Sequence, residues 1–245
     1  MSDKFIYDDN SASVYEKYTT MVGKVAEAGE TAVFLERFSS GGSALELGIG
    51  NGRVAVPLSE LGVKVEGIDN SESMLKLLAN CTDQIKAWKG NIADFKLEQH
   101  YRLIYCVFGT LMLLVRREEQ ISCLRSAADL LDDDGALIIE MPVPSLDGFV
   151  KGHRMTTRLL DQENTLLTAE VHDSVNQMLT STSLWFSGTS ITRLPQCIRY
   201  VYHQELDTMA ECVGLKLAER WEDWAEGAFT DISKRHISVY RRTSV

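Results

Sequence analysis

The segment SALELGIGNGRVAVPLSELGVKVEGID, residues 43–69, decides the fold that this sequence predicts. Residues 44–47 form a short apolar run of strand length, and residues 53–61 carry apolar side chains at helical spacing. A second buried-strand pattern covers residues 63–68 and stops at Asp69. Two parallel strands joined by a right-handed helical crossover place their carboxyl ends at one edge of a sheet. The segment therefore predicts the first unit of an α/β sheet with a ligand site at that edge.

Three glycines at alternate positions, Gly48, Gly50 and Gly52, fill the turn between the first strand and the helix. Glycine adopts positive φ at low cost and lets a ligand approach the backbone. Asp69, at the end of the second strand, can accept hydrogen bonds from both hydroxyls of a ribose. A dinucleotide site requires Gly-x-Gly-x-x-Gly, but here the third glycine comes one residue early and Arg53 fills the required position. The spacing favours a nucleoside with a polar tail over a dinucleotide.

The stretch from Glu46 to Gly52 resembles the Glu/Asp-x-Gly-x-Gly-x-Gly motif of class I S-adenosylmethionine-dependent methyltransferases, and Asp69 matches the acid that ends the family's second strand. The resemblance implies a Rossmann-like, seven-stranded mixed sheet with helices on both faces. It also implies S-adenosyl-L-methionine as cofactor and S-adenosyl-L-homocysteine as product. An ordinary tight turn in an unrelated α/β protein is the alternative that the glycines alone leave open.

Later segments extend this resemblance. Asn70 and Met74 match positions that flank the ribose and adenine in the family, although Met74 could equally be core. Asn91 matches the side chain that meets the adenine amino group, and Ile92 would pack on the purine. Phe108 ends a predicted strand and would face the methyl group or its acceptor; glycine follows it here, where relatives carry asparagine. The cofactor-binding set implied by the resemblance is Tyr15, Glu46, Gly48, Gly50, Gly52, Arg53, Asp69, Asn70, Met74, Asn91, Ile92 and Phe108.

The sequence predicts that the chain divides into a helical lid, a cofactor domain and an insert. Residues 1–38 are predicted to form the lid, because Tyr7 and Tyr15 resemble the start of small-molecule methyltransferases whose N-terminal segment covers the cofactor. Surface tyrosines on a frayed chain end are the alternative. Residues 39–150 and 203–245 are predicted to form the S-adenosylmethionine-binding α/β domain.

The insert, residues 151–202, is rich in Thr, Ser, Leu and Val in short alternating patterns, which predict several antiparallel strands. The nucleotide half of a class I methyltransferase is stereotyped. The resemblance therefore implies that this antiparallel β insert lies over the active site, where it would build the substrate contacts and the interface of a homodimer.

Methyl transfer by in-line displacement demands alignment of acceptor, methyl carbon and sulfur, and positioning alone can supply roughly 7–11 kcal/mol. A base matters when the acceptor carries a proton that must leave. The base candidates are Tyr7, Tyr15, His172 and His203, although a lone histidine in a strand is more often structural. Phe108 could favour a cationic amine through a cation–π contact. The catalytic candidates are Tyr15, Phe108 and His172.

The segment order and the insert resemble the bacterial methyltransferases that act on amino sugars and other natural products. N-methylation of an amine on a small-molecule acceptor is the first expectation, and O-methylation is the second. Two alternatives stay open: a catalytically inactive binding protein with this fold, and a nicotinamide-dependent oxidoreductase, which Arg53 disfavours.

Composition sets the remaining expectations. The 245 residues carry a formal net charge of −10, so a nucleic-acid partner is not expected. The longest apolar run, residues 103–115, is shorter than the ~18 residues of a membrane helix, and the polar start lacks an apolar signal core. The five cysteines form no Cys-x-x-Cys pair and predict buried thiols in a reducing compartment. The histidines show no metal spacing, so we expect a cytoplasmic protein without a metal or a membrane partner.

Overall fold

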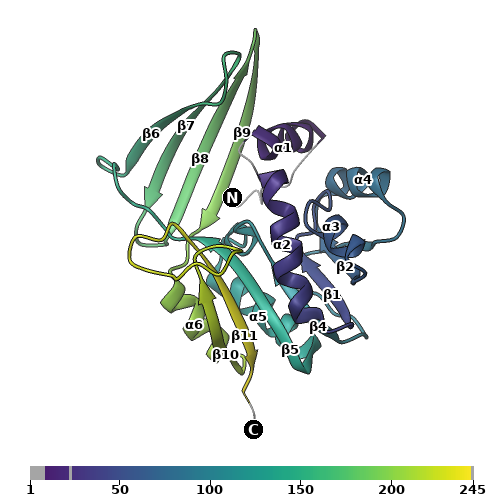
Figure 1. Cartoon of the computed structure of the whole chain (residues 1–245). Helices are drawn as coiled ribbons and strands as arrows, with labels where there is room; N and C mark the ends of the chain where they lie inside the picture. The colour runs from purple at the N-terminus through teal and green to yellow at the C-terminus, as the bar shows by residue number, and fades with distance from the viewer. Residues whose placement is uncertain (1–8, 22–23, 244–245) are drawn as a thin grey trace.

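The computed structural model describes residues 9–21 and 24–243, so Tyr7 of the predicted lid lies outside the described residues. The main sheet has seven strands in the order β10-β11-β5-β4-β1-β2-β3 (Figure 1). The strands are β1 (Ser43–Leu47), β2 (Lys64–Asp69), β3 (Lys86–Lys89), β4 (Tyr101–Cys106), β5 (Leu131–Pro142), β10 (Leu215–Trp221) and β11 (Arg235–Arg242). Only β11 runs against its neighbours in this sheet. The mixed seven-stranded sheet expected from the sequence is confirmed.

Helices cover both faces of the main sheet, as expected (Figure 1). One face is covered by α2 (Lys24–Ser39), α3 (Ala55–Glu60) and α4 (Glu72–Cys81), and the other by α5 (Arg117–Leu130) and α6 (His203–Glu211). Each face has its own hydrophobic core: Leu35 and Leu58 belong to the first, Leu124 and Met209 to the second. The central strands β1 and β4 and the second half of β5 are buried on both faces and are largely apolar.

The strand order reverses at β1, which lies between β4 and β2. In open α/β sheets, ligands bind outside the carboxyl ends of the strands at such a switch point. The glycine turn after β1 therefore opens at the position where this topology favours a ligand site.

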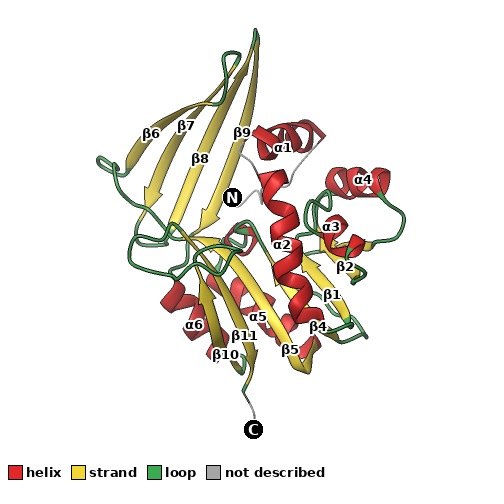
Figure 2. Ribbon diagram, viewed as in Figure 1, coloured by secondary structure: helices red, strands yellow, loops and turns green. Residues whose placement is uncertain are grey.

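The insert forms a second, antiparallel sheet in the order β6-β7-β8-β9 (Figure 2). Its strands are β6 (His153–Leu159), β7 (Asn164–Asp173), β8 (Met178–Ser187) and β9 (Ser190–Arg199). This sheet projects from the end of the main sheet and lies beside α1 (Asp9–Met21), where the ring of Tyr18 lies 6.1 Å from that of Trp185. The antiparallel strands predicted for the insert are confirmed.

Two local expectations need correction. The predicted helix at residues 53–61 is shorter and begins at Ala55, since Pro57 has no N–H to donate to the carbonyl of Arg53. All five cysteines are free, but only Cys106 and Cys123 are buried; Cys197 is half-buried, and Cys81 and Cys212 are exposed. Cys81 is the last residue of α4 and Cys212 directly follows α6, so both lie at exposed helix ends.

Candidate active site

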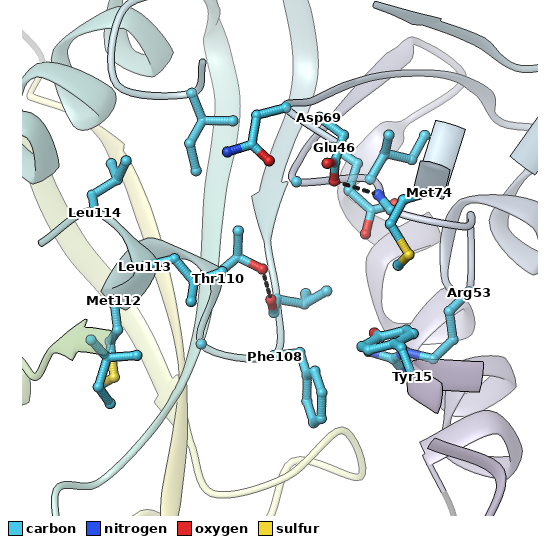
Figure 3. Close-up of a pocket in the computed structure, with 18 of the residues that line it drawn as sticks. Tyr15, Glu46, Arg53, Asp69, Met74, Phe108, Thr110, Met112, Leu113 and Leu114 are labelled. Carbon is cyan, nitrogen blue, oxygen red and sulfur yellow. Dashed lines mark hydrogen bonds between the residues drawn. The ribbon is translucent and has the colours of Figure 1, made fainter. Parts of the chain in front are cut away.

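A pocket opens at the carboxyl ends of β1, β2, β4 and β5, between the glycine turn and strand β9 (Figure 3). Its walls come from segments far apart in the chain, including helix α1 and the insert. The lining residues are Tyr15, Glu46, Gly48, Ile49, Gly50, Arg53, Asp69, Asn70, Met74, Gly90, Asn91, Ile92, Val107, Phe108, Gly109, Thr110, Met112, Leu113, Leu114, Pro142, Gln196 and Ile198.

Asp69 is held rigidly at the end of β2. The Gly50 N–H donates to its Oδ2 and the Ser71 N–H to its Oδ1, both over 2.8 Å. Burial raises the pKa of the Asp69 carboxyl, and the backbone N–H groups of Ser71 and Gly50 oppose that shift. The carboxylate is thus fixed by the glycine turn on one side and by the start of α4 on the other.

The glycine turn combines open space with close packing. Gly50 has φ of +56°, and a Cβ there would lie 3.1 Å from Met74 Cε, which lines the same pocket. A Cβ on Gly48 would collide with Thr110 Cγ2 at 2.4 Å, and one on Gly52 with Leu78 Cδ1 at 2.4 Å. Gly48 and Gly50 line the pocket, whereas Gly52 does not and instead lets α4 pack closely.

Glu46, on β1, is a buried carboxyl at the base of the pocket. Its Oε2 accepts a hydrogen bond from the Tyr105 hydroxyl over 3.0 Å, and it also accepts one from the backbone N–H of Ala55. Burial raises the pKa of Glu46 to about 8, although the Tyr105 hydrogen bond and the charge of Arg53 act in the opposite direction. This carboxyl therefore takes up or releases a proton near neutral pH.

Tyr15, Arg53 and Phe108 form an aromatic corner at one side of the pocket (Figure 3). The Arg53 guanidinium lies 5.2 Å from the centroid of the Phe108 ring, and the Tyr15 and Phe108 rings meet edge to face with centroids 6.3 Å apart. Burial raises the pKa of the Tyr15 hydroxyl, and its hydrogen bond with Arg53 only partly opposes this. The hydroxyl is therefore protonated at neutral pH.

Asn91 and Ile92 follow β3 and also line the pocket. The Asn91 Oδ1 accepts a hydrogen bond from the Ala93 N–H over 3.0 Å, which fixes the side chain and leaves its NH₂ group to donate. Ile92 is 9% exposed and also lines the pocket, as does Asn70 after β2. An amide can form hydrogen bonds with the edge of a purine, and an apolar side chain beside it can pack on the purine face.

The two histidine candidates lie outside the pocket lining. The His172 Nε2 is 3.0 Å from the Tyr200 hydroxyl, and His203 packs edge to face against Phe229. Among the residues that the structure describes, no histidine lines the pocket. The catalytic and cofactor-binding roles expected from the sequence, including those of His172, His203 and Gly52, stay predictions.

Several lining residues were missed by sequence reasoning. Gln196 and Ile198 come from β9, and Pro142 from the end of β5. Alternation along β9 could have placed Gln196 and Ile198 on one face of a strand. Nothing local indicated which face meets the pocket.

Comparison with known proteins shows the class to which this site belongs. A methyltransferase-domain family model matches residues 44–135. The solved CcbJ methyltransferase from Streptomyces caelestis is 34% identical, with a TM-score of 0.89 over 97% of this chain and 100% of that chain. A cypemycin N-terminal methyltransferase from Streptomyces sp is 25% identical over 99% of this chain and 100% of its own length. A dTDP-4-amino-2,3,4,6-tetradeoxy-D-glucose N,N-dimethyltransferase from Saccharopolyspora spinosa is 26% identical over 60% of this chain and 61% of its own length.

The chain belongs to the S-adenosylmethionine-dependent methyltransferases. It is an enzyme of this class, and S-adenosyl-L-methionine is its methyl donor. None of the helices within residues 9–21 and 24–243 is long and apolar enough to cross a bilayer.

Proposed function

We propose that this enzyme transfers a methyl group to an amine of a small-molecule acceptor by in-line displacement, in the cytoplasm. The observation that carries the proposal is the aromatic corner, where the face of Phe108 already holds the Arg53 cation at 5.2 Å. A neutral amine becomes a cation as it takes up the methyl group. An aromatic face stabilises that developing charge by about 0.5–2 kcal/mol.

The polar half of the pocket fits S-adenosyl-L-methionine, which supplies a methyl group on a positively charged sulfur. A Cβ on Gly50 would protrude beside Met74, so only glycine leaves the ligand room against the turn. Asp69 would accept hydrogen bonds from the ribose hydroxyls. Asn91 and Ile92 would hold the adenine. We assign the methionyl end to Gly48, Gly50, Glu46 and Arg53, with Asn70 and Met74 beside the ribose and Gly52 in a packing role.

The acceptor half of the pocket differs in chemistry. Its lining near Phe108 is largely apolar and includes Met112, Leu113, Pro142 and Ile198, with Gln196 as a neutral polar group. The acidic and basic side chains among the described lining residues, Glu46, Arg53 and Asp69, belong to the cofactor half. Such walls would select an uncharged acceptor, which for an amine is the nucleophilic form.

A hydroxyl acceptor would have to lose a proton during transfer. Tyr15 is itself protonated at neutral pH, because burial raises its pKa. Glu46 accepts a hydrogen bond from the Tyr105 hydroxyl, and Asp69 accepts one from the Gly50 N–H. Each carboxyl group therefore already has a hydrogen-bond partner within the protein. Amine methylation therefore fits this pocket better than hydroxyl methylation. The two relatives named as N-methylating enzymes support the same choice.

His172 retains a different role in this proposal. Strand pairing joins His172 to Leu179 and Leu179 to Ile198, so His172 shares the face of the insert that carries Ile198 to the pocket. Two strand spacings of about 4.8 Å separate them. We propose that His172 meets the far end of the acceptor rather than the nitrogen that is methylated.

The other face of the insert would form a homodimer interface. Leu159 pairs with Thr165, Thr165 with Phe186 and Phe186 with Ile191, so these residues form one row across the sheet. Leu159 is 75% and Ile191 62% exposed, although both are large and apolar. Sedimentation of the wild type against Leu159→Lys tests this: a monomer at all concentrations contradicts the dimer.

The function is tested with S-adenosylmethionine labelled with ¹³C in its methyl group. Two matched acceptor pairs are used: an aliphatic amino sugar with its hydroxyl counterpart, and a peptide with a free N-terminal amine with its acetylated form. We expect label only on the amine member of a pair, and its carbon shift identifies the bond formed. Label on the hydroxyl sugar would contradict amine specificity, and binding without transfer to either pair would favour a binding protein.

A further inference from the structure

A buried carboxylate that does not line the pocket accepts a hydrogen bond from the backbone of Phe108. Phe108 has φ of +58° and Gly109 φ of +69°, so two successive residues occupy the left-handed region. For a residue with a Cβ this conformation costs about 1–2 kcal/mol. It persists where the surrounding structure determines it. The position of the Phe108 ring therefore depends on what holds this turn.

Glu140, near the carboxyl end of β5, binds both residues of the turn. Its side-chain carboxylate accepts a hydrogen bond from the Phe108 N–H, and its backbone carbonyl accepts one from the Gly109 N–H over 3.1 Å. The Glu140 side chain is 7% exposed. Loss of this carboxylate would leave the Phe108 N–H without the partner it has now, which costs about 1–3 kcal/mol for a buried donor.

The same carboxylate is linked to the N-terminal helices. Arg235 of β11 has its Nη1 3.8 Å from Glu140 Oε1, and this Nη1 also pairs with Glu27 of α2. Helix α1, which precedes α2, carries Tyr15 against the Phe108 ring. The N-terminal helices thus reach Phe108 twice: its ring through Tyr15, and its backbone through Glu27, Arg235 and Glu140.

We infer that Glu140 is a positioning residue that fixes the Phe108 ring at the reaction site, and that the Glu27–Arg235 pair transmits the docking of helix α2 to that ring. The inference rests on the proposed function, because it takes Phe108 as a wall of the methyl-transfer site. Glu140 would act only through Phe108 and would leave the cofactor contacts of Asp69 unchanged.

The first test observes the Phe108 ring directly and needs no acceptor. The full chain is labelled with 4-fluorophenylalanine at its eight phenylalanines, and Phe108→Leu identifies the Phe108 ¹⁹F resonance with S-adenosylhomocysteine bound. We expect Glu140→Ala to shift and broaden that resonance. Glu140→Gln should restore one narrow signal near the wild-type position, because its amide oxygen can accept the same N–H.

Glu66 provides the matched control. It is 5% exposed and accepts a hydrogen bond from the Tyr101 hydroxyl over 2.7 Å, on β2 and outside the pocket lining. Glu66→Ala therefore removes a buried carboxylate without touching Phe108. An unchanged Phe108 signal in Glu140→Ala, or an equal shift in Glu66→Ala, overturns the inference.

The link to helix α2 has its own pair of variants. Glu27→Ala removes the ion pair to Arg235, while Arg37→Ala removes a second ion pair of α2, with Glu226, that does not reach Glu140. We expect the first to shift the Phe108 signal in the same direction as Glu140→Ala and the second to leave it in place. Equal effects of the two variants would show that α2 acts on Phe108 by general packing. This result would overturn the proposal that the Glu27–Arg235 pair transmits the docking of α2.

Kinetics on the methylated amine then separates this inference from the proposed function. Glu140→Ala should lower kcat roughly 10- to 100-fold with an unchanged Kd for S-adenosylhomocysteine, and Glu140→Gln should recover most of it. In a Phe108→Ala background the loss should vanish; a full further loss contradicts action through Phe108. If Phe108→Ala alone leaves kcat unchanged, Phe108 is not part of the reaction site and the proposed function is contradicted. The ¹⁹F experiment on Glu140 tests the position of the Phe108 ring independently of that outcome.

Discussion

The backbone N–H of Gly50 donates a hydrogen bond to the Asp69 carboxylate over 2.8 Å, which joins the glycine turn to the end of β2. The two residues are separated by a helix and a strand in sequence, and the crossover returns them to one edge of the sheet. The Ile68 carbonyl strengthens the junction by accepting from Gly48 N–H over 2.8 Å. Cofactor binding should therefore respond to changes in either residue.

Replacement of Asp69 by alanine should weaken cofactor binding strongly. Each hydrogen bond to a charged group contributes about 1.5–3 kcal/mol, so we expect the Kd for S-adenosylhomocysteine to rise at least about 10-fold in calorimetry. Asp83→Ala, at an exposed position after α4, is the control and should bind like the wild type. Wild-type affinity in Asp69→Ala would refute the ribose contact.

Gly50 and Gly62 form a matched pair for the glycine turn. Both have positive φ, +56° and +90°, so alanine at either costs about 1–2 kcal/mol of stability. A Cβ on Gly62 meets nothing within 4 Å, whereas one on Gly50 meets Met74 in the pocket. Thermal unfolding should show similar losses for both, and only Gly50→Ala should lose cofactor affinity. Equal affinity of the two variants would remove Gly50 from the site.

Phe108→Ala should reduce turnover far more than cofactor affinity. The ring contacts Arg53 and Tyr15 at the junction of the two halves of the pocket. Loss of a cation–π contact of about 0.5–2 kcal/mol and of the acceptor wall should lower kcat on the amine about 10-fold or more. Phe108→Leu keeps the bulk without the aromatic face and should be intermediate. Parallel losses in kcat and cofactor affinity would contradict an acceptor role.

The stability of the cofactor-free protein should depend on pH because of Glu46. Burial raises the pKa of this carboxyl from 4.5 to about 8. Between pH 4.5 and about 8, Glu46 in the folded chain holds a proton that it has released in the unfolded chain. The contribution of Glu46 to stability is therefore complete below the unfolded pKa and is lost as the pH rises through about 8.

The comparison of wild type with Glu46→Gln isolates this effect, because glutamine stays neutral. Urea unfolding at several pH values between about 5 and 8 gives the difference in free energy of unfolding, wild type minus variant. This difference should fall with rising pH by up to about 1.4 kcal/mol per unit. A difference that stays constant over that range would show that the pKa of Glu46 is not raised.

The glycine turn, Asp69, Asn91 and Phe108 were predictable because each is marked by local spacing. Each follows a predicted strand, and parallel strands bring their carboxyl ends to one edge. The same reasoning could have drawn attention to Glu140, an acid near the carboxyl end of a buried strand. It gave no reason to connect Glu140 with Phe108, since the hydrogen bond spans 32 residues.

The position of His172 relative to the pocket lining could not be predicted from local sequence. The pair His172-Asp173 has the composition of an oriented base, yet the imidazole contacts Tyr200 and lies away from the pocket lining. Gln196 and Ile198 carry no such pattern, yet they line the pocket. The orientation of the insert over the main sheet decides both outcomes, and it depends on packing between distant segments.

The sequence by itself determined the α/β sheet, the glycine turn and the acid that faces it, because hydrophobic periodicity and residue spacing are local properties of the chain. Only the tertiary structure decided which side chains of the insert reach the pocket and which carboxylate holds Phe108. Those contacts join residues brought together by packing, and no spacing along the chain encodes their distance.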